Sequence, residues 1–141
     1  MPAPVDYKQI LVLRKDINMR KGKMAAQAAH AAMAALIGGP ATTVPRGVAQ
    51  PFMSGQCLTI PLDPDTLAWL QGAFKKICVS VNSEAELLAL PAEAVQAGLR
   101  CALIQDNGLT EFGGVPTYTA VAIGPHASER LAPLTGNLPL L

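Results

Sequence analysis

The sequence predicts an α/β domain built as a three-layer sandwich, with a mixed, mostly parallel four-stranded sheet and helices on both faces. Short apolar runs typical of buried strands occur at 10–13, 76–81, 101–105 and 118–123. Helical patterns separate the first three of these runs. Half of the 141 residues are hydrophobic, which is enough to build the core of one domain over residues 1–141.

The first predicted strand leads into an alanine-rich helix over residues 23–35. The turn between them contains Arg20, Lys21, Gly22 and Lys23. Backbone N–H groups at a helix start attract anions, and three cations around a glycine strengthen that attraction. The junction therefore predicts a site for a phosphate or another anionic group.

Within the same helix, Lys23, Gln27 and His30 are spaced four and then three residues apart, so they share one face. This stripe is either a solvated face of an ordinary amphipathic helix or a continuation of the basic turn. For His30 the sequence favours a hydrogen-bonding partner over a catalytic base.

Residues 38–65 form a Gly/Pro-rich excursion that is long for a loop in a compact domain. Extended structure is expected within it at residues 57–60. A helix should begin at Asp63, because an acidic cap precedes Pro64 at the first helical position, and it should stop near Gly72.

A further helix should start at the capping-box pattern of Ser83 and run toward Gly98, bent or split by Pro91. Strand–helix–strand connections favour parallel strands with right-handed crossovers. The run at 118–123 follows without a helix, so it is expected to lie antiparallel to a neighbour.

The composition of the chain indicates the cellular compartment in which the protein is expected. No apolar run is long enough to span a bilayer, and no secretory signal is recognisable at the start. The three cysteines are far apart and fit neither a disulfide framework nor a zinc spacing, so a cytoplasmic protein is expected.

The net charge is only +1, but six of the eleven cations fall within the first 23 residues. They are Lys8, Arg14, Lys15, Arg20, Lys21 and Lys23. The cluster is either a solubilising face or an electropositive footprint for a polyanion. The second interpretation is favoured, because the charges bracket a strand-to-helix turn.

Asp106 ends the third predicted strand, and ligands of open α/β sheets bind outside the carboxyl ends of strands. Lys21 follows the end of the first strand, so parallel strands would bring both residues to one edge. Alone, Asp106 is better explained as a turn-initiating aspartate. With Lys21 and Thr110 expected nearby, a reactive site is favoured.

Residues 15–32, KDINMRKGKMAAQAAHAA, resemble the opening of the second (archaeal and eukaryotic-type) family of peptidyl-tRNA hydrolases. The similarity resumes at Trp69 and continues through LIQDNGLT at 103–110, PTYT at 116–119 and AIGP at 122–125. It covers nearly the whole chain except residues 38–65. The resemblance implies hydrolysis of the ester bond of peptidyl-tRNA by a homodimer, with Lys21, Asp106 and Thr110 as the catalytic residues.

Ester hydrolysis needs an activated water and stabilisation of an oxyanion, which a carboxylate, a lysine and a threonine hydroxyl can supply. The residues expected to contact the substrate are Arg20, Gly22, Lys23, Gln27, His30, Thr117 and Thr119. No metal or cofactor is expected, because no ligand cluster is apparent. The alternative is a non-enzymatic module of the same fold that binds tRNA or another anion.

Overall fold

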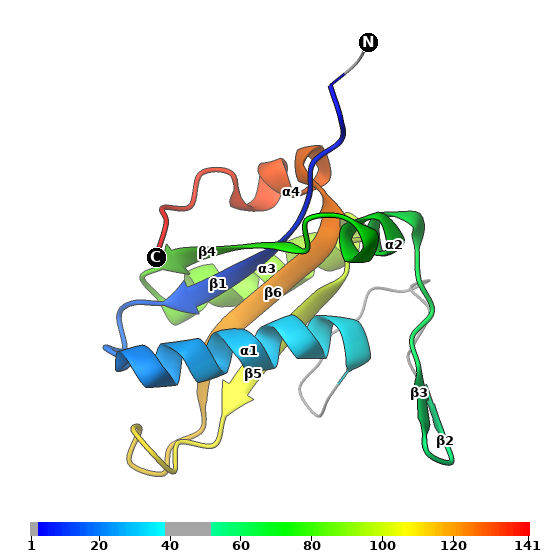
Figure 1. The fold of residues 1–141 in the computed structure, drawn as a ribbon. Helices are drawn as coiled ribbons and strands as arrows, with labels where there is room; N and C mark the ends of the chain where they lie inside the picture. Colours follow the sequence, from blue (N-terminus) through cyan, green and yellow to red (C-terminus); the bar gives the residue numbers. More distant parts are fainter. Residues whose placement is uncertain (1–2, 39–51) are drawn as a thin grey trace.

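The computed structural model describes residues 3–38 and 52–141 (Figure 1). Its main sheet has the strand order β4-β1-β6-β5. The strands are β1 (Tyr7–Arg14), β4 (Lys75–Val81), β5 (Cys101–Asp106) and β6 (Thr117–Ala127). All four strands therefore lie where the sequence predicts them.

The sheet is mixed, as predicted, but it is not mostly parallel in its pairing. Only β1 and β4 pair in parallel, whereas β6 pairs antiparallel with both β1 and β5. The difference arises because β6, the last strand, lies between β1 and β5. Since β5 and β1 are both antiparallel to β6, the strands β1, β4 and β5 still run in one direction. Their carboxyl ends therefore reach the same edge of the sheet.

Helices cover both faces of the sheet, which confirms the three-layer sandwich (Figure 1). Helix α1 (Lys21–Ile37) covers one face, and α3 (Glu84–Gln96) and α4 (Ser128–Thr135) cover the other. Successive strand residues alternate between faces, so Leu11 and Leu13 pack toward α1, and Ile10 and Val12 pack toward α3 and α4. On the inner face of α1, Ala31, Ala34 and Ala35 are buried against this sheet.

The predicted helix starts are confirmed by their caps. At the start of α2 (Pro64–Gln71), the side chain of Asp63 accepts a hydrogen bond from the backbone N–H of Thr66 at 2.8 Å. At the start of α3, the hydroxyl of Ser83 accepts from the N–H of Glu86 at 3.1 Å. Pro91 lies inside α3 without splitting it.

Two features differ from the sequence prediction. Strand β6 continues past Gly124 and Pro125 to Ala127, although this pair looks like punctuation in the sequence. Gly124 has a φ of +100°, and a Cβ there would lie 2.9 Å from the Lys8 carbonyl oxygen, so glycine permits the close strand pairing. Helix α4 was not predicted, because it is short and its only buried side chains are Leu131 and Thr135.

Residues 39–51 of the predicted excursion lie outside the described residues. The remainder contains a hairpin of β2 (Phe52–Ser54) and β3 (Cys57–Thr59), which confirms the extended structure expected near residue 57. All six strand residues are exposed, and Figure 1 shows the hairpin reaching away from the main sheet. No helix in the described part of the chain is long and apolar enough to cross a membrane.

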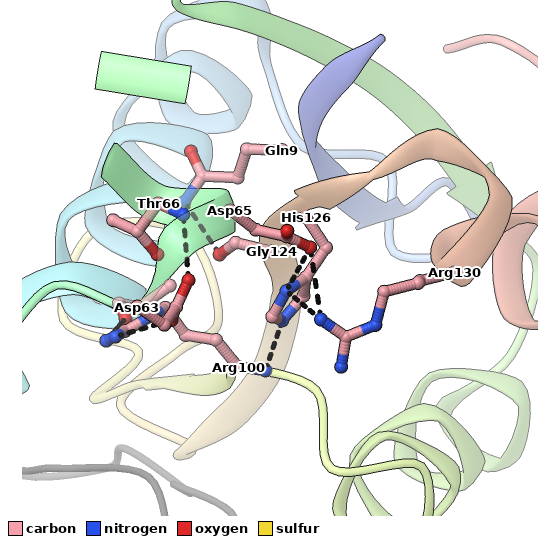
Figure 2. A network of polar contacts seen from close by, with 9 residues as sticks. Gln9, Asp63, Asp65, Thr66, Arg100, Gly124, His126 and Arg130 are labelled. Carbon is pink, nitrogen blue, oxygen red and sulfur yellow. Dashed lines mark hydrogen bonds and ion pairs between the residues drawn. The ribbon is translucent and has the colours of Figure 1, made fainter. Parts of the chain in front are cut away.

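A partly buried polar network joins the start of α2, the residue before β5, the end of β6 and α4 (Figure 2). At its centre, Nε2 of His126 accepts a hydrogen bond from the backbone N–H of Arg100 at 2.7 Å. His126 is only 3% exposed. Burial and the charge of Arg130 lower the pKa of His126 to about 4, against the opposing influence of Asp63 and Asp65. The fold therefore holds His126 neutral at physiological pH.

This network makes folding stability depend on pH. The unfolded chain protonates His126 near pH 6.5, whereas the folded chain does so only near pH 4. Between these values the unfolded state binds more protons, so the free energy of unfolding should fall by up to about 3 kcal/mol as the pH drops through that window. Denaturant unfolding of the wild type and of His126→Gln should show that the variant loses this slope. The exposed His30→Gln serves as the control, and a slope that persists in His126→Gln would contradict the assignment.

Candidate active site

Three segments meet at the sheet edge where β1 and β5 end: the first turn of α1, the last residue of β5 and the loop after it. The ammonium Nζ of Lys23 donates hydrogen bonds to Asp106 Oδ1 and Thr110 Oγ1, each at 2.8 Å. The side chains of Lys23 and Asp106 are each only 12% exposed. A partly buried ion pair thus joins residues that are 83 positions apart in the sequence.

The lysine in this cluster is Lys23, whereas the sequence analysis gave the catalytic position to Lys21. Lys21 lies at the same edge but is exposed, and it has no hydrogen bond or ion pair through its side chain to any described residue. The reason is helical phase. Lys23 and Gln27 are one turn apart and face the sheet. Lys21 is two positions before Lys23, and residues two positions apart in an α-helix point about 200° away from each other.

Gln27 and Thr119 form a buried chain of hydrogen bonds that ends at Asp106. Gln27 is 1% exposed, and its Nε2 donates to Asp106 Oδ1 at 3.3 Å. The fully buried Thr119 donates its hydroxyl proton to Gln27 Oε1. This second bond fixes the orientation of the amide, so that its N–H group points at the carboxylate.

The other expected contact residues lie at the margin. His30 is exposed, and the hydroxyl of Thr117 donates to the carbonyl oxygen of Val115 in its own loop, at 2.9 Å. Two further residues border the site without any signal in the sequence: Phe112, whose ring centroid lies 5.6 Å from Lys23 Nζ, and Glu111. Both lie in a loop whose position is set by long-range contacts, so the local sequence gave no signal for them.

Asp106 is also a turn residue, so the two interpretations of its role are compatible. Its Oδ2 accepts a hydrogen bond from the backbone N–H of Gly108 at 2.8 Å. Gly108 has a φ of +81°, and a Cβ there would lie 2.2 Å from the Val115 carbonyl oxygen. Glycine is therefore required at this position, and the turn holds the carboxylate in place.

The surroundings of Asp106 favour its charged form. Burial raises the pKa of Asp106, but the hydrogen bonds from Lys23 and Gly108, the charge of Lys23 and the hydrogen bond from Gln27 outweigh it. The pKa is therefore held below its usual value. A carboxylate that is held in its charged form beside an ammonium suits the orientation of a polar molecule such as water.

The predicted basic footprint is smaller in the structure than in the sequence. Arg14 is buried and pairs with Asp16 through two hydrogen bonds, of 2.6 and 3.0 Å, so it has a structural role. Lys8 lies at the opposite end of β1. Among the residues that the structure describes, the exposed cations at the edge with Asp106 are Lys15, Arg20 and Lys21. Within residues 3–38 and 52–141, no group of three or more His, Cys, Asp or Glu side chains is placed to hold a metal ion.

The contact between Lys23 and Asp106 predicts how the carboxyl group titrates. Lys23→Met removes both a hydrogen bond and a positive charge from a carboxylate that burial already disfavours, so the pKa of Asp106 should rise. Lys21→Met should change this pKa much less, because Lys21 points away. Titration of the Asp106 carboxyl carbon by NMR measures both variants. Equal rises in the two would mean that the general positive field, rather than the contact, controls the carboxylate.

The chain is similar over most of its length to known proteins. The profile of the family described as "Peptidyl-tRNA hydrolase PTH2" matches residues 7–141. A peptidyl-tRNA hydrolase of Methanocaldococcus jannaschii is 37% identical over 134 residues, covering 95% of this chain and 99% of that protein. Another from Thermococcus onnurineus is also 37% identical, over 137 residues, covering 96% and 98%. With its fold, its site and these similarities, the chain belongs to the PTH2 family of peptidyl-tRNA hydrolases.

Proposed function

We propose that the cluster of Lys23, Asp106 and Thr110 hydrolyses the ester bond of peptidyl-tRNA and releases peptide and free tRNA. The observation that carries this proposal is the position of Lys23 Nζ, which lies 2.8 Å from both Asp106 Oδ1 and Thr110 Oγ1. The cluster brings a carboxylate, an ammonium and a hydroxyl to one exposed sheet edge, and the family supplies the substrate class.

In the proposed reaction, water adds to the carbonyl carbon of the ester, and the bond from that carbon to the ribose oxygen then breaks. Asp106 orients the water and receives its proton in the transition state. Lys23 offsets the negative charge that develops on the carbonyl oxygen. Thr110 relays a proton to the leaving ribose oxygen, so the products are a peptide acid and a tRNA with a free hydroxyl.

The proposal gives different roles to the neighbouring residues. Gln27 and Thr119 position the Asp106 carboxylate and do not touch the reacting atoms. Arg20, Lys21 and the backbone at Gly22 face solvent at the start of α1, where they bind phosphates of the tRNA. His30 and Thr117 lie farther out and contact the substrate only at the edge of the site.

A module that binds tRNA without turnover is the alternative. Two observations favour the enzyme over this alternative. The relatives are peptidyl-tRNA hydrolases, and the ion pair between Lys23 and Asp106 is intact. The proposal also includes a metal-free reaction, one domain over the whole chain, a homodimer and a cytoplasmic location. These parts rest on the family resemblance and the composition. Hydrolysis in the presence of a chelator tests the metal-free reaction, and light scattering of the purified chain tests the homodimer.

Asp106→Asn is the sharpest test of the chemistry, because it keeps the shape of the side chain but removes its charge. General acid–base assistance is worth about 10² to 10⁴ in rate, so single-turnover hydrolysis of a labelled peptidyl-tRNA should slow by roughly that factor. Binding of tRNA should be nearly unchanged. Asp16→Asn removes a carboxylate that pairs with Arg14 and should retain turnover. Near wild-type turnover in Asp106→Asn, with a normal thermal melt, would leave Asp106 as a turn residue only.

Arg20→Ala tests the basic edge separately. The Arg20 side chain is 90% exposed, so it is available to a phosphate. Losing one phosphate contact should weaken tRNA binding and flatten the slope of log affinity against log salt by about 0.7 to 0.9. Lys8→Ala, at the opposite end of β1, is the matched control and should preserve the slope. A salt dependence that is unchanged in Arg20→Ala would place the tRNA elsewhere.

A further inference from the structure

A pocket of about 250 Å³ opens beside the proposed catalytic cluster. It is lined by Ile17, Asn18, Arg20, Thr110, Glu111 and Phe112. Thr110 belongs to both the pocket and the cluster, because its hydroxyl accepts the hydrogen bond from Lys23. Whatever occupies the pocket therefore lies next to the ester that the cluster acts on.

The carboxylate of Glu111 is the unusual group in this pocket, since its side chain is only 19% exposed. It lies 3.4 Å from the backbone N–H of Arg20 and 3.7 Å from Arg20 Nε. Both distances exceed the roughly 2.7 to 2.9 Å of a strong charge-assisted hydrogen bond. A carboxylate accepts about four hydrogen bonds, so Glu111 keeps acceptor capacity that faces the pocket.

The chemistry of the pocket selects the part of the substrate that fits it. A carboxylate repels a phosphate, so the inner wall suits a neutral hydrogen-bond donor, while the exposed guanidinium of Arg20 at the rim suits an anion. In peptidyl-tRNA, the group bonded directly to the ester is a ribose. Next to the ester it carries a free 2′-hydroxyl, which is both a donor and an acceptor.

We infer that this pocket binds the 3′-terminal ribose of the tRNA, and that Glu111 accepts a hydrogen bond from the hydroxyl vicinal to the ester. Arg20 at the rim then faces the phosphate of the same nucleotide. Glu111 is a specificity-determining residue, since it makes the site prefer a ribonucleotide to a deoxyribonucleotide at the 3′ end. The inference rests on the proposed function and extends it to the recognition of the sugar.

A cycle of protein and substrate changes tests this contact. The probes are two short RNA hairpins that carry the same N-acetylaminoacyl ester, one ending in a ribose and one in a 2′-deoxyribose. The kcat/KM values are compared for the wild type, Glu111→Gln and Glu111→Ala, and the hydrolysis of both esters in buffer alone corrects for their intrinsic reactivity. Hydrogen bonds to charged groups predict a corrected preference for ribose of roughly tenfold or more in the wild type.

Glu111→Ala should abolish this corrected preference, and Glu111→Gln, which keeps a carbonyl acceptor, should retain part of it. Loss of activity on both esters by the same factor would overturn the inference, because a structural role affects both equally. A preference in Glu111→Ala equal to that of the wild type would also overturn it. A third ester, with a methyl group on the amide nitrogen of its N-acetylaminoacyl group, lacks the N–H donor of the peptide. If Glu111→Ala changes the preference between the methylated and unmethylated esters instead of the preference for ribose, the donor is the peptide and the ribose assignment is wrong.

Binding of the unesterified hairpins separates this inference from the proposed function. The wild type should bind the hairpin ending in ribose several-fold more tightly than the deoxy form, and Glu111→Ala should bind both equally. This measurement needs no turnover. A chain that discriminates between the hairpins but does not hydrolyse the ester would refute the catalytic proposal and retain the ribose pocket. If the protein hydrolyses the ester but its preference for ribose does not depend on Glu111, the ribose pocket is refuted and the catalytic proposal is retained.

Discussion

The ion pair between Lys23 and Asp106 is the interaction on which the site depends. Charges that are only 12% exposed are costly unless they are paired and hydrogen-bonded, and this pair lies between a helix start and a strand end. The chain therefore places other donors around the carboxylate, from Gln27 in α1 and from Gly108 in the turn. The helix, the strand and the loop are thus held in one arrangement by the same charge.

Much of the fold follows from local patterns in the sequence. The caps at Asp63 and Ser83 and the four apolar runs are local signals, and the structure confirms them. The order of the strands is not local. The sequence predicts that the first three strands run in one direction, but β6 lies between β1 and β5 because of pairing between distant residues. The sequence correctly predicts that the carboxyl ends of β1 and β5 reach the same edge of the sheet, because this depends only on strand direction. The expected mostly parallel pairing was wrong, because pairing depends on which strands are neighbours in the sheet.

The site shows the same division at the level of residues. Asp106 and Thr110 follow from the end of a strand and the turn after it. The choice between Lys21 and Lys23 depends on helical phase, and the spacing of four between Lys23 and Gln27 was the signal that pointed to Lys23. Glu111 reaches Arg20 across 91 positions of sequence, and no local pattern encodes that contact.

The distribution of paired charges explains how a chain of net charge +1 has a locally basic edge. Every aspartate of the sequence pairs with a cation: Asp6 with Lys75, Asp16 with Arg14, Asp63 with Arg100, Asp65 with Arg130, and Asp106 with Lys23. At the edge of the site, Lys15, Arg20 and Lys21 remain exposed to solvent, with Glu111 as the acid nearest to Arg20. A polyanion responds to this local field over about one Debye length of 8 to 10 Å and not to the net charge. Low net charge is therefore no argument against an RNA substrate. The aspartates are matched within the fold, whereas at this edge Lys15 and Lys21 have no side-chain partner among the described residues and Arg20 has only a long contact with Glu111 at 3.7 Å.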